Sequence, residues 1–273
     1  MKHWALNRAF QTDEGVVRYG VLGSGKDVVL VHGTPWSSYS WHLLLPELSK
    51  RYRVFYYDLI GYGQSDMLAS QSVSLDVQGN LLAKLIDYWQ LTKPSVIAHD
   101  YGGATALRAH LLHGCEFSRL QLIDVVAVAP WGSPFFAHVR QFEQAFAGVP
   151  DYIHRAIVRA YIGTALHKRL EDDQFDQLLE PWLTAQGKAA FYRQIAQADQ
   201  KYTDDIEPFY SAIRCPVSIL WGENDTWIPV DSGLKLHNAI PHSSFEILPG
   251  CGHLAPLETP GLVLQQVKDF FDF

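Results

Sequence analysis

The chain has 273 residues, of which 48% are hydrophobic and 19% are charged, as is usual for a globular protein that buries a sizeable core. Its formal net charge is −7, and no basic run is interleaved with aromatic residues, which argues against a nucleic-acid partner. The longest apolar runs, such as residues 28–31 and 125–130, are far too short to span a membrane, so no membrane partner is expected.

The beginning of the chain and its cysteines indicate a cellular compartment. The first ten residues include several polar and charged side chains and lack the apolar stretch of a secretory signal. The three cysteines, Cys115, Cys215 and Cys251, are too few and too scattered for a disulfide framework or a Cys-x-x-Cys metal site. We therefore expect a cytoplasmic protein with reduced thiols and no bound metal.

Short apolar runs alternate with amphipathic stretches of helical length. Near-continuous apolarity predicts strands that are covered on both faces, and the alternation predicts an open, doubly wound α/β sheet. The predicted strands are residues 16–22, 28–31, 54–57, 95–98, 120–126, 217–221 and 244–248. The predicted helices between them are residues 41–48, 75–89, 104–112, 230–239 and 262–271.

The alternation fails in one aromatic-rich interval, residues 134–213. This interval predicts four successive helices, at residues 137–147, 152–166, 173–183 and 188–198. A helical insertion between two strands of such a sheet lies over the carboxyl ends of the strands, where substrates are selected. We therefore predict an α/β core formed by residues 1–133 and 214–273, and a helical cap formed by residues 134–213.

A sharp strand-to-helix turn is predicted around Asp100. The segment from Ser95 to Ala104 runs from an apolar strand into a helix through Gly102 and Gly103. Such a turn lifts the side chain at its apex above the sheet, and the close approach of the backbone requires small neighbours. The usual pattern, Gly-x-Ser-x-Gly, occurs nowhere in the chain, so no serine competes with Asp100 as the nucleophile. A helix N-cap would also account for an aspartate here.

Two other loops favour the nucleophile over the N-cap. The loop from Val31 to Pro35 follows a predicted strand, and the backbone N–H groups of Thr34 and Tyr101 can form an oxyanion hole. His253 lies in the loop after the last predicted strand, from which it can reach the apex of the turn. These three loops predict a catalytic site at the carboxyl edge of the sheet.

Two aspartates compete to orient His253. Asp225 lies in a Gly-x-x-Asp loop after the predicted strand 217–221 and gives the chain order nucleophile, acid, histidine. Asp124 lies at the end of an apolar strand, where a carboxylate is costly unless it is paired. We predict Asp225 as the orienting acid and keep Asp124 as the alternative.

Taken together, these residues resemble the α/β-hydrolase superfamily over nearly the whole chain. This resemblance implies a mostly parallel, doubly wound sheet with a helical cap inserted after the sixth strand. The segment from His99 to Gly103 is similar to the His-Asp-x-Gly-Gly elbow of haloalkane dehalogenases, haloacetate dehalogenases and epoxide hydrolases. The haloacetate group resembles the chain most, through Trp41-His42, Arg108 and the run from Arg119 to Asp124, and in that group the strand-end aspartate is the orienting acid.

The chain departs from these families at the positions that recognise the substrate. Haloacetate dehalogenases hold the substrate carboxylate with two arginines, where this chain has Tyr101 and Ala104, so a haloacid substrate is not expected. Haloalkane dehalogenases place halide donors, a tryptophan and often an asparagine, where this chain has Tyr101 and Thr34.

Other aromatic side chains could supply the missing donors to a leaving group. Trp36, Trp131 and Trp182 are candidates for a halide site, although each is also a natural packing residue. Epoxide hydrolases use two cap tyrosines to protonate the opening ring, and Tyr152 and Tyr192 lie at suitable places in the predicted cap. Aromatic packing would account for these two tyrosines equally well.

A carboxylate nucleophile predicts a particular reaction. Asp100 can attack a saturated carbon without prior deprotonation and form an ester, and His253 then activates the water that hydrolyses this ester. No cofactor is required, and the expected partner is a small-molecule substrate. We predict a dehalogenase-like hydrolase, with an epoxide hydrolase as the alternative. An esterase or lactonase of the same fold, or a ligand-binding homologue that has lost turnover, are further alternatives.

Overall fold

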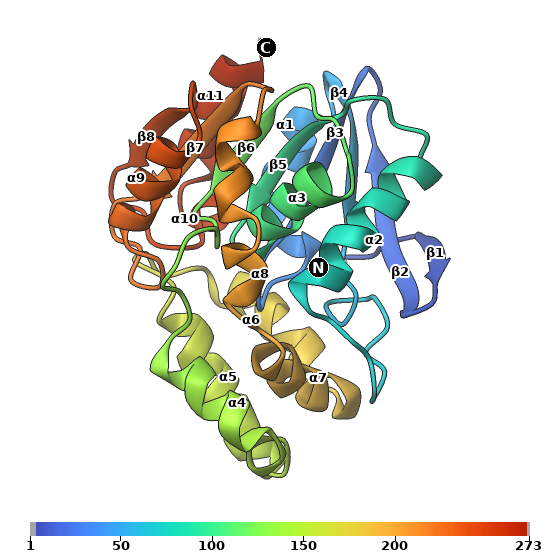
Figure 1. Ribbon diagram of the computed structural model, residues 1–273. Coiled ribbons are helices and arrows are strands. Elements are labelled where there is room, and N and C mark those ends of the chain that lie inside the picture. Colours follow the sequence, from blue (N-terminus) through green and yellow to red (C-terminus); the bar gives the residue numbers. More distant parts are fainter. Residues whose placement is uncertain (1–3, 272–273) are drawn as a thin grey trace.

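The computed structural model describes residues 4–271, and its centre is an eight-stranded sheet (Figure 1). The strand order is β1-β2-β4-β3-β5-β6-β7-β8; β2 is antiparallel to both β1 and β4, and every other neighbouring pair is parallel. The predicted fold class is therefore confirmed. The strands are β1 Arg8–Thr12, β2 Gly15–Leu22, β3 Lys26–Val31, β4 Tyr52–Tyr57, β5 Ser95–His99, β6 Leu120–Ile123, β7 Val217–Gly222 and β8 Ser244–Leu248.

Two strands differ from the prediction. Strand β1 was not predicted, because it lies at the edge of the sheet and its side chains are mostly exposed, so it carries no apolar run. Strand β6 ends at Ile123 rather than at residue 126, because Asp124 adopts a positive φ of 46°, which a strand does not tolerate. The chain therefore turns out of the sheet directly at a buried carboxyl group.

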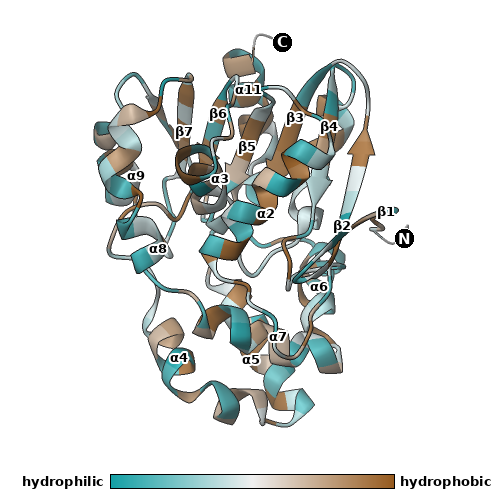
Figure 2. Ribbon diagram, turned by 45° about the vertical axis from the view of Figure 1, so that its right-hand side comes forward, coloured by the Kyte–Doolittle hydropathy of each residue, from teal (hydrophilic) through white to brown (hydrophobic). Residues whose placement is uncertain are grey.

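Helices cover both faces of the sheet. Val29 and Val31 of β3 belong to one hydrophobic cluster, and Val28 and Leu30 belong to another, as expected for a strand buried on both faces. Figure 2 shows the hydrophobic residues concentrated along the central strands. One face is covered by α2 (Leu75–Tyr88), α3 (Tyr101–Leu112) and α9 (Val230–Ala239), and the other by α1 (Leu45–Leu48), α10 (Ala255–Glu258) and α11 (Pro260–Phe271).

The interval between β6 and β7 is helical and lies beyond one end of the sheet (Figure 1). Helix α4 packs against α7 and changes direction at Phe142, whose φ of −129° and ψ of 34° are not helical. Residues 134–213, all of which are described, contain no strand. The helices of this interval are α4 Pro134–Ala147, α5 Asp151–Gly163, α6 Asp172–Leu179, α7 Ala185–Ala196 and α8 Lys201–Asp204, with the 3-10 helices η2 Glu180–Leu183 and η3 Glu207–Ala212.

The first predicted helix, residues 41–48, is broken. The structure has a 3-10 helix, η1 Ser38–Trp41, followed by the short helix α1, which has a proline in its first turn. Within residues 4–271, no helix has both the length and the apolar character needed to cross a membrane.

Candidate active site

Asp100 lies at the apex of a strained turn between β5 and α3. Its φ of 50° and ψ of −120° are unfavourable for a residue with a side chain, and such strain is found mainly at functional sites. A Cβ atom on Gly102 would lie 2.2 Å from the Val31 carbonyl oxygen, and one on Gly103 would lie 2.3 Å from the Val125 side chain. The turn therefore requires both glycines, and it presents the Asp100 side chain at the carboxyl end of β5.

The two oxygens of the Asp100 carboxylate have different partners. Oδ1 accepts a hydrogen bond of 2.6 Å from the Thr34 backbone N–H, and the Tyr101 backbone N–H also bonds to the carboxylate. Oδ2 lies 3.1 Å from His253 Nε2. The Thr34 N–H therefore already holds one oxygen of the nucleophile, and the other oxygen faces the histidine.

His32 stabilises the loop that contains Thr34. The buried His32 ring bonds through Nδ1 to the Gly33 carbonyl at 2.8 Å and accepts at Nε2 from the Leu59 backbone N–H at 2.9 Å. Because both ring nitrogens are engaged and burial lowers its pKa, His32 is neutral. The ring thus links the loops after β3 and β4 and keeps the Thr34 N–H in place.

The structure brings Asp225, and not Asp124, to His253. Asp225 Oδ2 lies 2.7 Å from His253 Nδ1, and its Oδ1 accepts from the backbone N–H groups of Trp227 and Ile228 at 2.8 and 2.9 Å. Asp124 instead accepts from the Gly222 backbone N–H at 2.6 Å. Its Oδ2 has no partner among the described residues. Burial first, and then the charge of Asp225, raise the pKa of Asp124 well above its usual value and so favour its neutral form.

Asp100 and His253 form a buried ion pair. Burial favours the neutral form of Asp100, but the hydrogen bond and charge of His253 outweigh it and lower the pKa of the carboxyl group. Burial likewise opposes the charged form of His253, yet Asp225 and Asp100 together raise the pKa of the imidazole well above its usual value. His99 stays neutral, because burial lowers its pKa to about 4, and it bonds at 2.8 Å to the His253 carbonyl. The free site therefore holds an ionised nucleophile.

A cavity of about 270 Å³ opens over Asp100 between the sheet and residues 134–213. Trp131 and Trp227 line it, but their indole N–H groups already donate to Thr203 and Thr164. The Tyr161 hydroxyl has no hydrogen-bond partner among the described residues. Burial, followed by the charge of Asp100, raises the pKa of Tyr161 well above its usual value, so this hydroxyl keeps its proton. The lining is Thr34, Asp100, Tyr101, Val126, Trp131, Gly132, Ser133, Pro134, Phe136, Tyr161, Thr226, Trp227 and Ile228.

Residues 28–266 match the family model described as the alpha/beta hydrolase family. The chain belongs to this family. A crystal structure of an alpha/beta hydrolase fold protein from Burkholderia ambifaria is 47% identical, with a TM-score of 0.95 over 97% of this chain and 98% of that chain. The 2-hydroxy-6-oxo-2,4-heptadienoate hydrolase of Pseudomonas putida is 26% identical over 91% of this chain and 90% of that protein. The epoxide hydrolase CorEH has a TM-score of 0.76 over 97% of this chain and 98% of that chain, but its 19% identity shows the fold alone. The prediction of a hydrolase is therefore confirmed.

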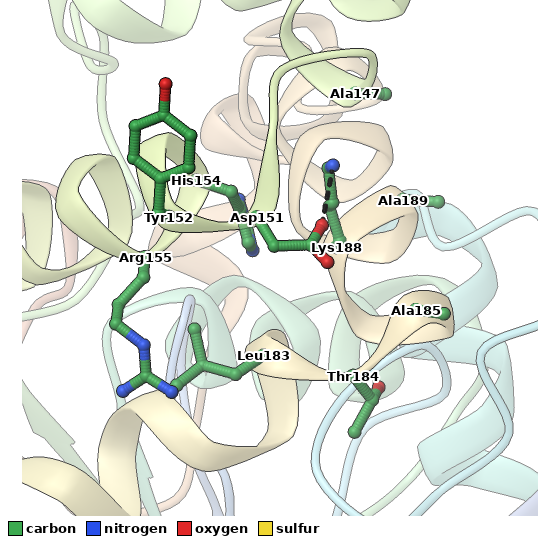
Figure 3. A pocket seen from close by; sticks show the side chains of 10 residues that line it. All are labelled: Ala147, Asp151, Tyr152, His154, Arg155, Leu183, Thr184, Ala185, Lys188 and Ala189. Carbon is green, nitrogen blue, oxygen red and sulfur yellow. Dashed lines mark hydrogen bonds and ion pairs between the residues drawn. The ribbon is translucent and has the colours of Figure 1, made fainter.

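Both cap tyrosines proposed from the sequence lie away from the cavity of this hydrolase. Tyr152 is 74% exposed and lines a separate cavity of about 560 Å³ with Lys188 (Figure 3). The Tyr192 hydroxyl bonds to His154 Nδ1 at 2.9 Å inside the helical interval. Neither tyrosine lines the cavity that contains Asp100, so the structure does not support either residue as the proton donor.

Two of the three tryptophan candidates pack around the site rather than line it. Trp36 stacks on Trp227 with ring centroids 5.6 Å apart, and Trp182 donates from Nε1 to the Pro35 carbonyl at 2.8 Å. Trp131 alone of the three lines the cavity. Halide donation by Trp182 is therefore excluded by its hydrogen bond.

Tyr161 was missed by the sequence reasoning, although a signal was present. In α5, the buried residues His154, Val158 and Ile162 recur at helical spacing, so they mark the face that packs on the rest of the protein. Tyr161 follows His154 by two turns and lies on the same face. Helical periodicity would therefore have favoured Tyr161 as the tyrosine that faces the rest of the protein. Tyr152 comes before the first buried residue of α5, His154.

Among residues 4–271, no group of three or more histidine, cysteine, aspartate or glutamate side chains is arranged to hold a metal ion.

Proposed function

We propose that this hydrolase cleaves a small organic substrate at a saturated carbon through a covalent ester with Asp100. The observation that supports this most strongly is that the two oxygens of the Asp100 carboxylate have different partners. The Thr34 backbone N–H holds Oδ1, while Oδ2 lies 3.1 Å from His253 Nε2, and Asp100 lines the cavity. A carboxylate held in this way is ionised and ready to attack.

In the first step, Oδ2 of Asp100 attacks the substrate carbon. A carbon–oxygen bond forms, and the bond to the leaving group breaks with its electron pair. Esterification removes the negative charge of Asp100, which is one of the two charges that raise the pKa of His253. The pKa of the imidazole therefore falls when the ester forms, and His253 becomes able to accept a proton.

In the second step, His253 takes a proton from a water molecule, and the hydroxide attacks the carboxyl carbon of Asp100. The charge that develops on Oδ1 is stabilised by the Thr34 and Tyr101 N–H groups, and such donors contribute about 3 kcal/mol each. The bond between the carboxyl carbon and Oδ2 then breaks, and His253 returns its proton to Oδ2, so that the product leaves as an alcohol that carries the former Oδ2. The water oxygen stays in the carboxyl group, which loses its remaining proton to solvent. Asp225 orients the imidazole throughout, through its 2.7 Å contact with Nδ1.

The cavity favours an epoxide as the group that is opened. An epoxide oxygen must gain a proton as the ring opens, and the uncommitted Tyr161 hydroxyl lies within the electrostatic reach of Asp100. The Trp131 and Trp227 indoles, by contrast, are already engaged and offer no N–H to a halide.

Cleavage of a carbon–halogen bond is the second candidate. The elbow sequence resembles that of dehalogenases, and Trp36 Nε1 is buried without a partner among the described residues.

The covalent ester can be tested by weighing the protein. His253→Gln should form the ester and fail to hydrolyse it, so epoxides or haloalkanes should add one hydroxyalkyl or alkyl group per chain, on the peptide that contains Asp100. Asp100→Ala should show no adduct and no turnover. If turnover survives in freshly made Asp100→Ala, the proposed nucleophile is wrong. An adduct on a hydroxyl would indicate serine-type ester or lactone cleavage, and no adduct with any panel member would favour a binding protein.

A further inference from the structure

The backbone of His253 is held on both sides. Its N–H donates to the Ala165 carbonyl at 2.9 Å, and its carbonyl oxygen bonds to His99 Nε2 at 2.8 Å. Both histidines are fully buried. The main chain of the catalytic histidine is therefore fixed between the end of β5 and the segment that follows α5.

Glu258, the last residue of α10, holds the two residues next to this histidine. Its Oε2 accepts from the Gly252 backbone N–H at 3.3 Å, and its Oε1 accepts from the Leu254 backbone N–H at 3.1 Å. Glu258 is only 9% exposed. A buried carboxyl group is costly unless its oxygens are hydrogen-bonded, so these contacts stabilise it in this place.

The same carboxyl group also binds the segment that follows α5. Its Oε2 accepts from the backbone N–H groups of His167 at 2.8 Å and of Lys168 at 2.7 Å. The approach is close, because a Cβ atom on Gly252 would lie 2.6 Å from the His167 nitrogen and 2.7 Å from Glu258 Oε1. Glu258 thus ties residues 165–168 of the helical interval to the loop that contains His253.

Capping of α10 does not account for these contacts. Leu254 is the N-cap residue of this helix, and a carboxyl group close to the start of a helix commonly accepts from the N-cap N–H. The other three donors lie outside α10, and two of them belong to the segment that follows α5. The carboxyl group therefore supports the loop of the histidine and not only a helix of four residues.

We propose that Glu258 is a positioning residue that acts through His253 and keeps the imidazole aligned for hydrolysis of the Asp100 ester. This role rests on the proposed function, in which His253 activates the attacking water. A reacting group that is misplaced by about 1 Å can lose about 100-fold in rate. Ester formation needs the Asp100 carboxylate rather than a base, so it should depend far less on Glu258.

The role can be measured in Glu258→Gln, which keeps the shape of the side chain but replaces one acceptor oxygen with an NH₂ group. In a single turnover, the ester should decay about 10- to 100-fold more slowly than in the wild type, whereas the rate of ester formation at neutral pH should change by less than about threefold. The matched control Glu223→Gln changes an exposed carboxyl group that accepts from the Gly250 N–H in the same loop. It should leave both rates unchanged.

A purely structural role of Glu258 predicts a different result. Loss of folded protein lowers the amount of ester that forms, but it does not change the rate constant with which an ester already formed decays. If Glu258→Gln does not fold, Glu258→Asp is measured in the same way. This variant keeps a carboxyl group on a side chain one methylene shorter, which cannot reach all four N–H groups, and the ester should again decay at least about tenfold more slowly.

A second measurement needs no substrate. The Nδ1–H of His253 donates to Asp225 at 2.7 Å, and its proton NMR resonance is identified by its absence in His253→Gln. This resonance should shift in Glu258→Gln and stay unchanged in Glu223→Gln. The inference is overturned if the resonance is the same in Glu258→Gln as in the wild type, or if the ester decays at the wild-type rate. Failure of the proposed function would appear instead as a missing adduct in His253→Gln, while the resonance would still shift in Glu258→Gln.

Discussion

The two sides of the cavity are built in different ways. On the sheet side, Asp100, Asp225 and His253 follow β5, β7 and β8, and each is held by at least two hydrogen bonds within a buried network. On the opposite side, Phe136 of α4 and Tyr161 of α5 contribute aromatic surface, and Tyr161 stacks on Trp227 with centroids 4.6 Å apart. The first side is fixed by backbone geometry, and the second by side-chain packing.

This difference separates the chemistry from the choice of substrate. A group that must attack or carry a proton needs a position fixed within a fraction of an ångström, and strand ends provide it. A surface that selects among substrates can change with the packing of helices, and α4, with its irregular residue Phe142, is one such helix. Changes on the sheet side should therefore abolish steps of the reaction, whereas changes on the opposite side should alter rates for particular substrates.

The largest effect is expected at the orienting acid. Asp225→Asn removes the charge that holds His253 in place and should slow hydrolysis of the ester by about 10⁴-fold. Asp124→Asn keeps the carbonyl oxygen that accepts from Gly222, and because burial favours the neutral form of Asp124, the rate should stay within about tenfold of the wild type. Single-turnover decay of the ester measures both rates. The assignment is reversed if Asp124→Asn is inactive and Asp225→Asn is not.

The sheet side could largely be predicted from the sequence because its signals are local. The glycines around Asp100 and the loop positions of Asp225 and His253 follow directly from apolar strands a few residues away. The strand β1 and the end of β6 could not be predicted, since an exposed edge strand lacks an apolar run and a positive φ at Asp124 leaves no mark in the composition.

The opposite side could be predicted only in outline. Its helices were expected from their periodicity, but which tyrosine reaches Asp100 depends on how α5 lies over the sheet, and that is a contact between residues far apart in the chain. The hydrogen bonds that Gln194 accepts could not be predicted for the same reason, because its partners Thr34 and Tyr62 come from loops more than 130 residues earlier.

The next effect tests the proton donor on the helical side. Tyr161→Phe should lower the rate of ester formation from epoxides by about 100-fold, because the ring oxygen loses its acid. Haloalkanes release a stable anion and should be affected far less. The matched variant Tyr152→Phe changes an exposed phenol and should leave both rates unchanged. If Tyr161→Phe lowered the rates of ester formation from epoxides and from haloalkanes equally, Tyr161 would not act as the acid in ring opening, and the preference for an epoxide substrate would lose its support.

A smaller effect concerns the pH dependence of ester formation, which needs an ionised Asp100. In the wild type, His253 holds the pKa of Asp100 below its usual value in spite of burial, so the rate should be level from neutral pH to about pH 5. In His253→Gln, burial acts without the cation and raises the pKa, so the rate should fall as the pH drops through that higher value. Rapid-mixing measurement of leaving-group release checks this. Identical pH profiles for the wild type and His253→Gln would show that the ion pair with His253 does not determine the ionisation of Asp100.

The smallest effect is expected for a substitution of Tyr192, which should change only the stability of the protein. Since His154 Nε2 bonds to the Trp182 carbonyl at 2.9 Å, His154 Nδ1 is the acceptor for the Tyr192 hydroxyl. Tyr192→Phe leaves this buried nitrogen without a donor and should lower the free energy of unfolding by about 1–3 kcal/mol. Tyr152→Phe, at an exposed position of the same interval, should change it by less than about 0.5 kcal/mol. Urea unfolding measures both. If instead Tyr192→Phe kept full stability but lost activity on epoxides, the Tyr192 hydroxyl would act on the substrate and not only in the packing of the helices.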